Sequence, residues 1–183
     1  MNMFLRLLLI YIRARIRPRC PPLGPCETPF MVLPTDLDVY AHMNNGVYFS
    51  VMDLGRVDML TRSGLLKSMR EARYVPIVAA ETIRFRRPLK IFQKYTVETR
   101  VIGWDDKAFL MEQRFLRPSK RGKAPDIIAE AVVRARFLCG NGAVPSSDFL
   151  SVLGAAGAAS PPLPEWIDQW NSRQAQFRDT ASA

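Results

Sequence analysis

The run from Gly46 to Gly64 has the spacing of a helix but too little polar surface for an exposed one. Its apolar side chains recur three and four residues apart, which is the helical period: Val47, Tyr48, Val51, Met52, Leu54, Met59 and Leu60. The first half is apolar on nearly every face, and a helix of that kind is enclosed by other structure. Asp53 is the only charge in that half, and Arg56 can pair with it on the same face. The rest of the chain must therefore supply a surface that surrounds this helix.

Four stretches after this run have the character of strands, and most of them alternate apolar and polar residues. They cover residues 81–87, 95–101, 107–117 and 127–138, with turn signals between them. Alternation with a period of two predicts half-buried antiparallel strands. Residues 29–35 form an apolar run that predicts one further strand ahead of the helix. An enclosed helix and an antiparallel sheet together predict an α+β domain in which the sheet wraps the helix.

A chain of 183 residues suits one domain with short appendages. We place the domain in residues 29–140 and expect a helical extension of low order in residues 141–183. Within the extension, residues 146–153 and 163–177 have helical patterns. Trp166 and Trp170 stand four residues apart and predict a stripe on the second of these helices that packs on the body of the domain or on a second subunit.

Residues 1–28 are expected to form a basic, apolar arm and a proline-rich linker. Residues 3–12 are strongly apolar, but a membrane-spanning helix needs about 20 apolar residues. A signal peptide places its positive charge ahead of the apolar stretch, whereas most arginines here follow it. We therefore expect a helix that lies on a membrane surface, or one that packs on its own domain or on a partner subunit.

The net charge of +9 is uneven, because five arginines and no acid precede Glu27. Such an arm could contact anionic lipid, nucleic acid or a polyanionic small molecule. The three cysteines, Cys20, Cys26 and Cys139, are too few for a disulfide framework. A reducing compartment, and hence the cytoplasm with or without membrane association, is the simpler expectation. No Cys/His cluster has metal-ligand spacing, so no metal site is expected.

Polar groups are concentrated in residues 34–48, between the first expected strand and the helix. This stretch holds Asp36, Asp38 and His42, the only histidine of the chain. Asn44 or Asn45 is placed to cap the helix, because its side chain can accept a hydrogen bond from an unpaired amide. Polar groups at this density form either a turn or a reaction centre, and we favour a reaction centre.

The sequence Asp-Leu-Asp-Val-Tyr-Ala-His-Met-Asn-Asn-Gly-Val-Tyr at residues 36–48, followed by Met-Asp-Leu-Gly-Arg at residues 52–56, resembles the hotdog-fold acyl-CoA thioesterases. Its greatest similarity is to their 4-hydroxybenzoyl-CoA thioesterase-like branch, and it covers roughly residues 29–138. The resemblance implies a long helix wrapped by an antiparallel sheet of five or six strands. It also implies a homodimer or dimer of dimers with active sites at the subunit interface, and acyl-CoA or acyl-carrier protein as substrate.

The resemblance also assigns roles to residues. An aspartate at the end of the first strand is the usual base or nucleophile, and Asp38 has that position by its spacing to Asn45 and Tyr48. His42 lies where plant acyl-carrier-protein thioesterases carry a catalytic histidine. The asparagine between those two residues is Tyr40 here, and Glu81 is shifted from the position of their later glutamate. For Asp36 we expect a turn-forming role.

Thioester hydrolysis needs an activated water or a carboxylate nucleophile, and donors aimed at the developing oxyanion. The amides of Gly46 and Val47 open the enclosed helix, so its dipole end can hold the thioester oxygen. His42 can act on the substrate or satisfy the turn. Basic side chains on one strand suit the phosphates of coenzyme A. The residues expected to contact substrate are Asn45, Gly46, Val47, Tyr48, Arg84 and Arg86.

Two other functions remain open on the sequence. Hotdog hydratases and dehydratases carry an Asp–His pair with an adjacent Asn-Pro, but here the pair is one residue closer and no Asn-Pro is present. The other is a non-catalytic module that binds acyl groups or a membrane through the basic arm. For the thioesterase, no cofactor and no nucleic-acid partner are expected.

Overall fold

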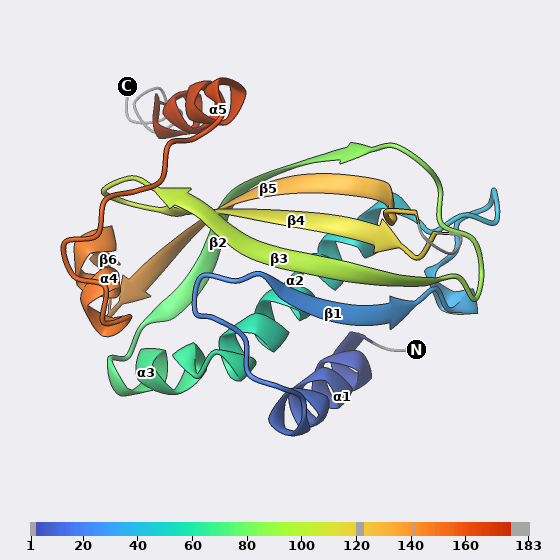
Figure 1. The fold of residues 1–183 in the computed structure, drawn as a ribbon, viewed down its shortest axis with the longest axis horizontal. Coiled ribbons are helices and arrows are strands. Elements are labelled where there is room, and N and C mark those ends of the chain that lie inside the picture. Colours follow the sequence, from blue (N-terminus) through green and yellow to red (C-terminus); the bar gives the residue numbers. More distant parts are fainter. Residues whose placement is uncertain (1–2, 120–122, 141, 177–183) are drawn as a thin grey trace.

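The computed structural model describes residues 3–119, 123–140 and 142–176, and within them the chain builds one curled antiparallel sheet. The strand order is β1-β3-β4-β5-β2, and β6 pairs with β5 (Figure 1). The strands are β1 (Cys26–Met31), β2 (Val75–Phe85), β3 (Lys94–Trp104), β4 (Phe109–Arg117), β5 (Asp126–Cys139) and β6 (Gly142–Val144). The predicted α+β class with a sheet of five or six strands is confirmed.

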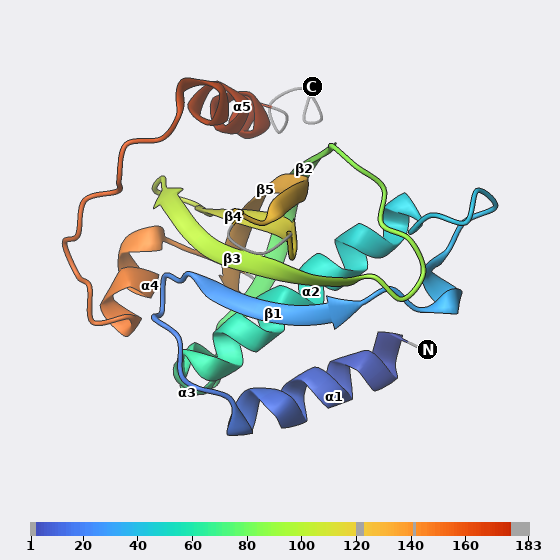
Figure 2. The ribbon, with the colours of Figure 1, turned by 45° about the vertical axis from the view of Figure 1, so that its right-hand side comes forward.

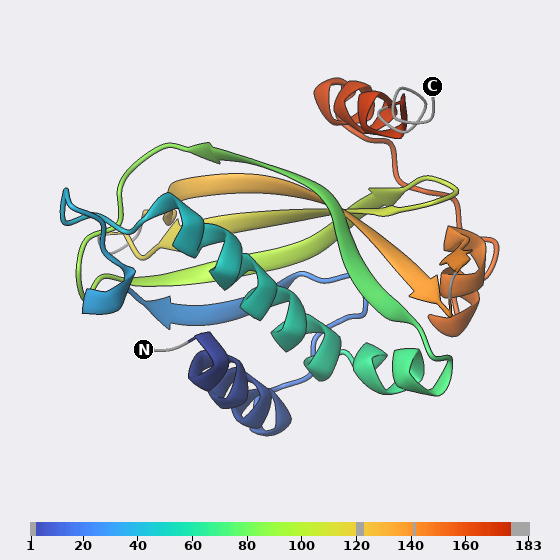
Figure 3. The same ribbon diagram turned by 180° about the vertical axis from the view of Figure 1, so that it is seen from behind.

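Helix α2 (Asn45–Arg62) lies across the inner face of the curled sheet (Figure 3). Tyr48, Val51 and Met52 on its first turns are almost fully buried in the main core. They pack with Val97 and Phe115 from the sheet, so the helix is held by the strands that wrap it. The predicted enclosed helix is confirmed, because the apolar faces that the sequence showed are the faces that the sheet covers.

Several boundaries differ from the prediction. The first strand ends at Met31, and residues 34–36 form a short 3-10 helix with Pro34 at its start. Strand β2 begins at Val75, six residues before the predicted 81–87 stretch, because residues 75–80 lack alternation and include a proline. Helix α3 (Leu65–Glu71) and strand β6 were not predicted.

Helix α1 (Met3–Ile16) lies alongside α2, next to β1 (Figure 2). A buried ion pair holds the helix on the domain: the Arg6 guanidinium donates to the Asp36 carboxylate at 2.6 Å. After the helix, Arg17 and Arg62 both donate to the backbone carbonyl of Glu27 and to the carboxylate of Asp58. These arginines therefore occupy the Glu27 carbonyl of β1, an edge strand, and compete there with any further strand for that carbonyl.

Helices α4 (Ser146–Val152) and α5 (Glu165–Gln176) follow the sheet, and α5 covers the face opposite α2. Both helices were predicted, and Phe177, at the end of the second predicted run, lies outside the described residues. Ile167 is buried and packs with Leu110 and Val132 on the outer face of the sheet. Trp170 packs against the same cluster, whereas Trp166 is 56% exposed. On the body of this chain the predicted stripe is formed by Trp170 without Trp166, because Ile167 occupies the buried face, and packing of Trp166 on a second subunit stays a prediction.

Candidate active site

A tight loop before α2 carries the predicted catalytic residues. The Asp38 N–H donates to the His42 carbonyl at 2.8 Å, and the Ala41 N–H donates to the Asp38 carbonyl at 3.1 Å. Ala41 has φ of 57°, the left-handed conformation that turns the chain back on itself. A backbone bridge between His42 and Lys90 ties the loop to the segment that follows β2. The loop is thus a closed turn at one end of the sheet.

The Asp38 carboxylate folds back onto this loop. Its Oδ1 accepts hydrogen bonds from the N–H groups of Tyr40 at 2.9 Å and His42 at 3.2 Å. Its Oδ2 has no hydrogen-bond partner in the ranges that the structure describes. The residue is half-buried and does not line the large cavities formed by those ranges. One oxygen therefore anchors the carboxylate, and the other can meet a ligand that approaches the loop from outside.

His42 is half-buried and is linked to Asp38 through its backbone. Within the described part of the chain, no hydrogen bond joins its imidazole to the Asp38 carboxylate. The sequence allowed for a contact between the two side chains, and this chain by itself does not form one. Both ring nitrogens are consequently available to a substrate or to water.

The start of α2 is capped by Asn44. Its Oδ1 accepts from the Gly46 N–H at 2.8 Å, and its carbonyl accepts from the Val47 N–H at 2.9 Å. The predicted use of the Gly46 and Val47 amides as oxyanion donors is therefore not met, because the cap already satisfies both. The amide of Asn45, the first residue of the helix, has no acceptor among the described residues.

Tyr48 was expected to contact substrate, but the structure places its side chain in the core. Its ring lies 4.9 Å from that of Phe115 and 5.0 Å from that of Phe85, measured between centroids. Burial raises the pKa of its phenol to about 12. The expected substrate role of this side chain is corrected to a packing role, since the helical period points it toward the sheet.

Arg84 near the end of β2 and Arg86 directly after it lie at the end of the sheet where the loop lies. Arg86 donates to Glu130 at 2.7 Å, and Arg87 beside it donates to Asp126 at 3.1 Å. Arg84 has no ion-pair partner within residues 3–119, 123–140 and 142–176. It lines two hollows of about 460 and 570 Å³. Arg84 is thus the cation of this group whose charge is not already neutralised.

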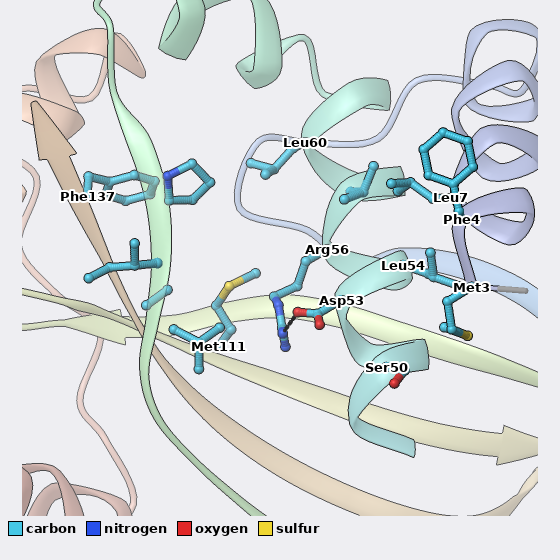
Figure 4. A pocket seen from close by; sticks show the side chains of 15 residues that line it. Met3, Phe4, Leu7, Ser50, Asp53, Leu54, Arg56, Leu60, Met111 and Phe137 are labelled. Atoms are coloured by element: carbon cyan, nitrogen blue, oxygen red, sulfur yellow. Dashed lines mark hydrogen bonds and ion pairs between the residues drawn. The ribbon is translucent and has the colours of Figure 1, made fainter. Parts of the chain in front are cut away.

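A cavity of about 540 Å³ lies between α1, α2 and β2 (Figure 4). On α2 it begins at Ser50 and continues past Leu54 and Val57 to Leu60. The first turns of α1 contribute further apolar side chains, and the sheet contributes the rest: Met3, Phe4, Leu7, Pro76, Ile77, Val78, Met111, Ala135 and Phe137. The lining is largely aliphatic, so the cavity suits an apolar chain.

Asp53 and Arg56 bring charge into this largely apolar wall. Arg56 forms the predicted ion pair with Asp53 and also donates to Gln113 Oε1 at 2.7 Å. A Glu81 oxygen lies 3.7 Å from the same guanidinium, from across the gap between α2 and β2. Burial raises the pKa of the Glu81 carboxyl, with nearby Arg56 acting against that rise. The sequence pattern identified the Asp53–Arg56 pair, but the cross-element partners Glu81 and Gln113 depend on how the sheet curls.

The loop and the cavity are connected through α2. The free amide of Asn45 opens the helix, and Ser50 marks the near end of the cavity. Five residues of helix separate these positions by about 7.5 Å along the axis. No group of three or more His, Cys, Asp or Glu side chains within the described residues is arranged to hold a metal ion.

Most of the chain is similar in sequence to known proteins. The sequence model of the thioesterase-like superfamily matches residues 32–171. Protein THEM6 of Xenopus laevis is 32% identical over 168 residues, which are 91% of this chain and 77% of that protein. Proteins of the same name from Danio rerio and Drosophila melanogaster match over 65% and 42% of their own length, less than two thirds in both cases.

Solved thioesterase structures share the fold. YbaW, a probable thioesterase of Escherichia coli, superposes with a TM-score of 0.64 at 20% identity, over 72% of this chain and 98% of that one. An Asp→Asn variant of 4-hydroxybenzoyl-CoA thioesterase, solved with 4-hydroxybenzoyl-CoA, superposes with a TM-score of 0.62 at 15% identity. That match covers 70% of this chain and 97% of the other. The wrapped helix of this chain is therefore the hotdog arrangement of these proteins.

Proposed function

Because the chain belongs to the thioesterase-like superfamily, we propose that it hydrolyses acyl-CoA thioesters and that Asp38 is the carboxylate that acts on the thioester. Thioester hydrolysis is supported by the family and by relatives that carry the thioesterase name, including a probable thioesterase of Saccharomyces cerevisiae. One observation carries the assignment of the site. A carboxylate with one free oxygen lies at the head of α2, and an apolar cavity runs along the same helix.

Asp38 acts through Oδ2, because its loop holds Oδ1. This oxygen either attacks the thioester carbonyl carbon or takes a proton from the water that attacks it. On both routes the carbon–sulfur bond breaks and the coenzyme A thiolate leaves; on the first route water then hydrolyses the acyl–Asp38 anhydride, which releases the acid and restores the carboxylate. The loop amides orient the carboxylate in advance, so little freedom is lost when the substrate binds.

The developing oxyanion is held by the start of α2. The Asn45 N–H lacks an acceptor within the described residues, and it stands at the positive end of the helix dipole. A fixed donor of this kind stabilises the tetrahedral state more than the ground state. We assign to His42, which belongs to the same loop, a hydrogen bond to the leaving sulfur, since its imidazole has no partner among the described residues.

The acyl group lies in the cavity along α2. Its aliphatic walls, such as Leu54, Val57 and Ile77, favour a fatty acyl chain. The distance of about 7.5 Å from Asn45 to Ser50 is short enough for the first carbons of such a chain to bridge the gap. At the other end of the substrate, Arg84 binds coenzyme A phosphate, because it lines two hollows at this end of the sheet and has no ion-pair partner among the described residues.

The active unit is a homodimer formed through β2. This strand lies at one edge of the sheet, and Val75 and Val78 expose apolar surface along it. The opposite edge, β1, is occupied by arginine side chains. An open edge with apolar side chains is a ready template for a second copy. Pairing there would close the cavity wall beside β2 and bring the partner subunit toward the loop.

Thiol release from a series of saturated acyl-CoAs tests this function. We expect kcat/KM to rise with chain length until the cavity is filled. Val57→Phe narrows the cavity, so it should lower kcat/KM by about tenfold for the longest good substrate and little for short ones. Ile16→Phe, at an exposed position outside the cavity, is the control. Absence of thiol release from every acyl-CoA, or an unchanged chain-length profile in Val57→Phe, would contradict the proposal.

A further inference from the structure

The outward face of α1 is apolar, although it faces solvent in the described structure. Leu5, Leu8, Ile12 and Ile16 are 45, 46, 52 and 82% exposed. Their spacing of three and four residues puts them on one side of the helix. The opposite side, with Arg6 and its ion pair, faces the domain. A helix that packs on a soluble domain normally turns polar residues outward, and α1 instead exposes this apolar stripe while it buries Arg6 with Ile10 and Ala14.

Unpaired positive charge surrounds this apolar stripe. Arg13, Arg15 and Arg19 have no carboxylate partner among the residues that the structure describes. The guanidinium of Arg15 stacks on Tyr11 at 4.6 Å and donates to its hydroxyl. Arg15, with Arg70 of the adjacent α3, lowers the pKa of that exposed phenol. Cations therefore collect beside the stripe with no acid to neutralise them.

One kind of surface can bind both the apolar stripe and the unpaired arginines. Exposed aliphatic side chains gain by leaving water, and free guanidinium groups gain by meeting phosphate. A phospholipid bilayer with anionic headgroups supplies acyl chains and phosphates at adjacent depths. A helix of 14 residues is about 21 Å long, shorter than the hydrocarbon core of about 30 Å. None of the described helices is long and apolar enough to span a membrane.

We propose that α1 lies flat on the surface of an anionic phospholipid bilayer. In this position Leu5, Leu8 and Ile12 enter the acyl-chain boundary, and the free arginines bind headgroup phosphates. The first turns of α1 also line the cavity along α2 (Figure 4). The same helix therefore contacts the bilayer on its outward side and forms part of the cavity wall with its first turns.

The proposed dimer is compatible with this contact. When two sheets join edge to edge through antiparallel β2 strands, the two-fold axis is perpendicular to the joined sheet. Both copies of α1 then lie on the same side of the molecule, the side that carries α2 (Figure 1). One flat surface can contact both helices at once, and two contacts bind more tightly than one.

Vesicle sedimentation tests the bilayer contact without depending on catalysis. The purified chain is mixed with phosphatidylcholine vesicles, with and without phosphatidylglycerol. We expect sedimentation with the anionic vesicles, and weakening of it by salt. Leu8→Glu with Ile12→Glu should reduce the bound fraction at a given lipid concentration by about tenfold or more. Replacing Arg13, Arg15 and Arg19 together by glutamine should abolish the preference for anionic over neutral vesicles.

Trp166→Glu is the matched control, because this exposed aromatic side chain lies on α5, on the far side of the sheet from α1. It should sediment like the unmodified chain. The substituted positions on α1 are exposed, and a urea-unfolding midpoint for each variant confirms that the fold is intact. Failure of the unmodified chain to sediment, or equal sedimentation after Leu8→Glu with Ile12→Glu, would overturn the proposal.

Two further outcomes would also overturn it. If the two glutamate substitutions lower the mass in solution while vesicles never bind, a second copy covers the stripe. If neutral and anionic vesicles bind equally and salt has no effect, the arginines do not contact headgroups. A fluorophore attached to the thiol that Leu8→Cys introduces, in a Cys139→Ser background, should shift its emission to shorter wavelength only with anionic vesicles.

Discussion

Asp36 and Asp38 stand two residues apart but have different physical roles. Asp36 is buried, and its Oδ2 accepts from the Leu33 N–H at 2.8 Å and from Arg6 at 2.6 Å. Asp38 is half-buried and keeps one oxygen free. The sequence predicted a local turn role for Asp36 and could not show Arg6, because the two residues are 30 positions apart. Asp36 therefore joins the arm to the loop that presents Asp38.

The losses in the free energy of unfolding on removing Arg6 and Asp36 should not be additive, because the two side chains form one buried pair. Arg6→Met leaves the Asp36 carboxylate buried without its counter-ion, and we expect a loss of about 3–5 kcal/mol in the free energy of unfolding. Arg6→Met combined with Asp36→Asn should lose clearly less than the two single losses added together. Urea unfolding at neutral pH measures all three variants.

Arg13→Met provides the control for this cycle, because Arg13 is on the same helix without a described carboxylate partner. Its effect should stay within about 0.5 kcal/mol. If Arg6→Met costs no more than Arg13→Met, the pair does not hold the arm on the domain.

At the scale of elements, α5 is held by one polar cluster. Asp105 Oδ2 accepts from Asn171 of α5 at 2.8 Å and from Arg134 of β5 at 3.0 Å. Arg134 in turn donates to Asn171 Oδ1 at 2.7 Å. Burial by itself raises the pKa of Asp105, but the hydrogen bonds from Asn171, the Lys107 amide and Arg134 outweigh it and lower the pKa overall. The ionised carboxylate is thus the form that docks the helix.

The lowered pKa gives a pH dependence of known sign. The ionised Asp105 carboxylate contributes fully to stability above its pKa in the unfolded chain, about 3.9. This contribution is lost as the pH falls through its lower pKa in the folded chain. Asp105→Asn should reduce the free energy of unfolding by about 1–2 kcal/mol at neutral pH. The difference from the unmodified chain should shrink below about pH 4.

Unfolding curves at several pH values measure this difference. Asp106→Asn, at the exposed neighbouring position, should show little effect at any pH. A difference for Asp105→Asn that stays constant down to strongly acidic pH would show that the charge of this carboxylate does not dock α5.

The comparison between sequence and structure also belongs to this scale. Periodicity located α2 and the four later strands, because each has a face that the core must cover. It missed the first half of β2, whose Val-Pro-Ile-Val-Ala-Ala run lies at a sheet edge and has no polar face to alternate with. The short α3 and β6 carry too few residues to establish a period.

For the candidate site, the motif predicted Asp38 and His42, and the structure brings both into one loop. The motif did not identify which amides are free, because that depends on which asparagine caps the helix. With Asn44 as the cap, the Gly46 and Val47 amides already donate to Asn44, whereas the Asn45 amide has no acceptor among the described residues. The cavity could not be read from the sequence, since its walls come from three elements that meet only in the folded chain.

At the scale of the whole molecule, the two edges of the sheet differ. The β1 edge is occupied by Arg17 and Arg62, which donate to the Glu27 carbonyl. The β2 edge is open and apolar, with Val78 42% exposed. The dimer proposed above depends on this asymmetry, because an open edge can be completed by an identical one.

Val78→Lys should therefore dissociate the dimer. A lysine on an edge strand opposes strand pairing and would face the same charge on the partner. Light scattering after size exclusion should give the unmodified chain a mass of about twice 20.8 kDa or a higher even multiple. The variant should approach 20.8 kDa. Ile91→Lys, at a similarly exposed position away from β2, should not change the mass, and an unmodified chain already at 20.8 kDa would refute the dimer.

The central claim is that the free oxygen of Asp38 acts on an acyl-CoA thioester, and Asp38→Asn tests it most directly. The asparagine side-chain oxygen can still accept from the Tyr40 and His42 amides, so the loop should keep its conformation. We predict that kcat for thiol release falls by about 10²–10⁴-fold while the unfolding midpoint is unchanged. Thiol release at the unmodified rate from a folded Asp38→Asn variant would contradict the account.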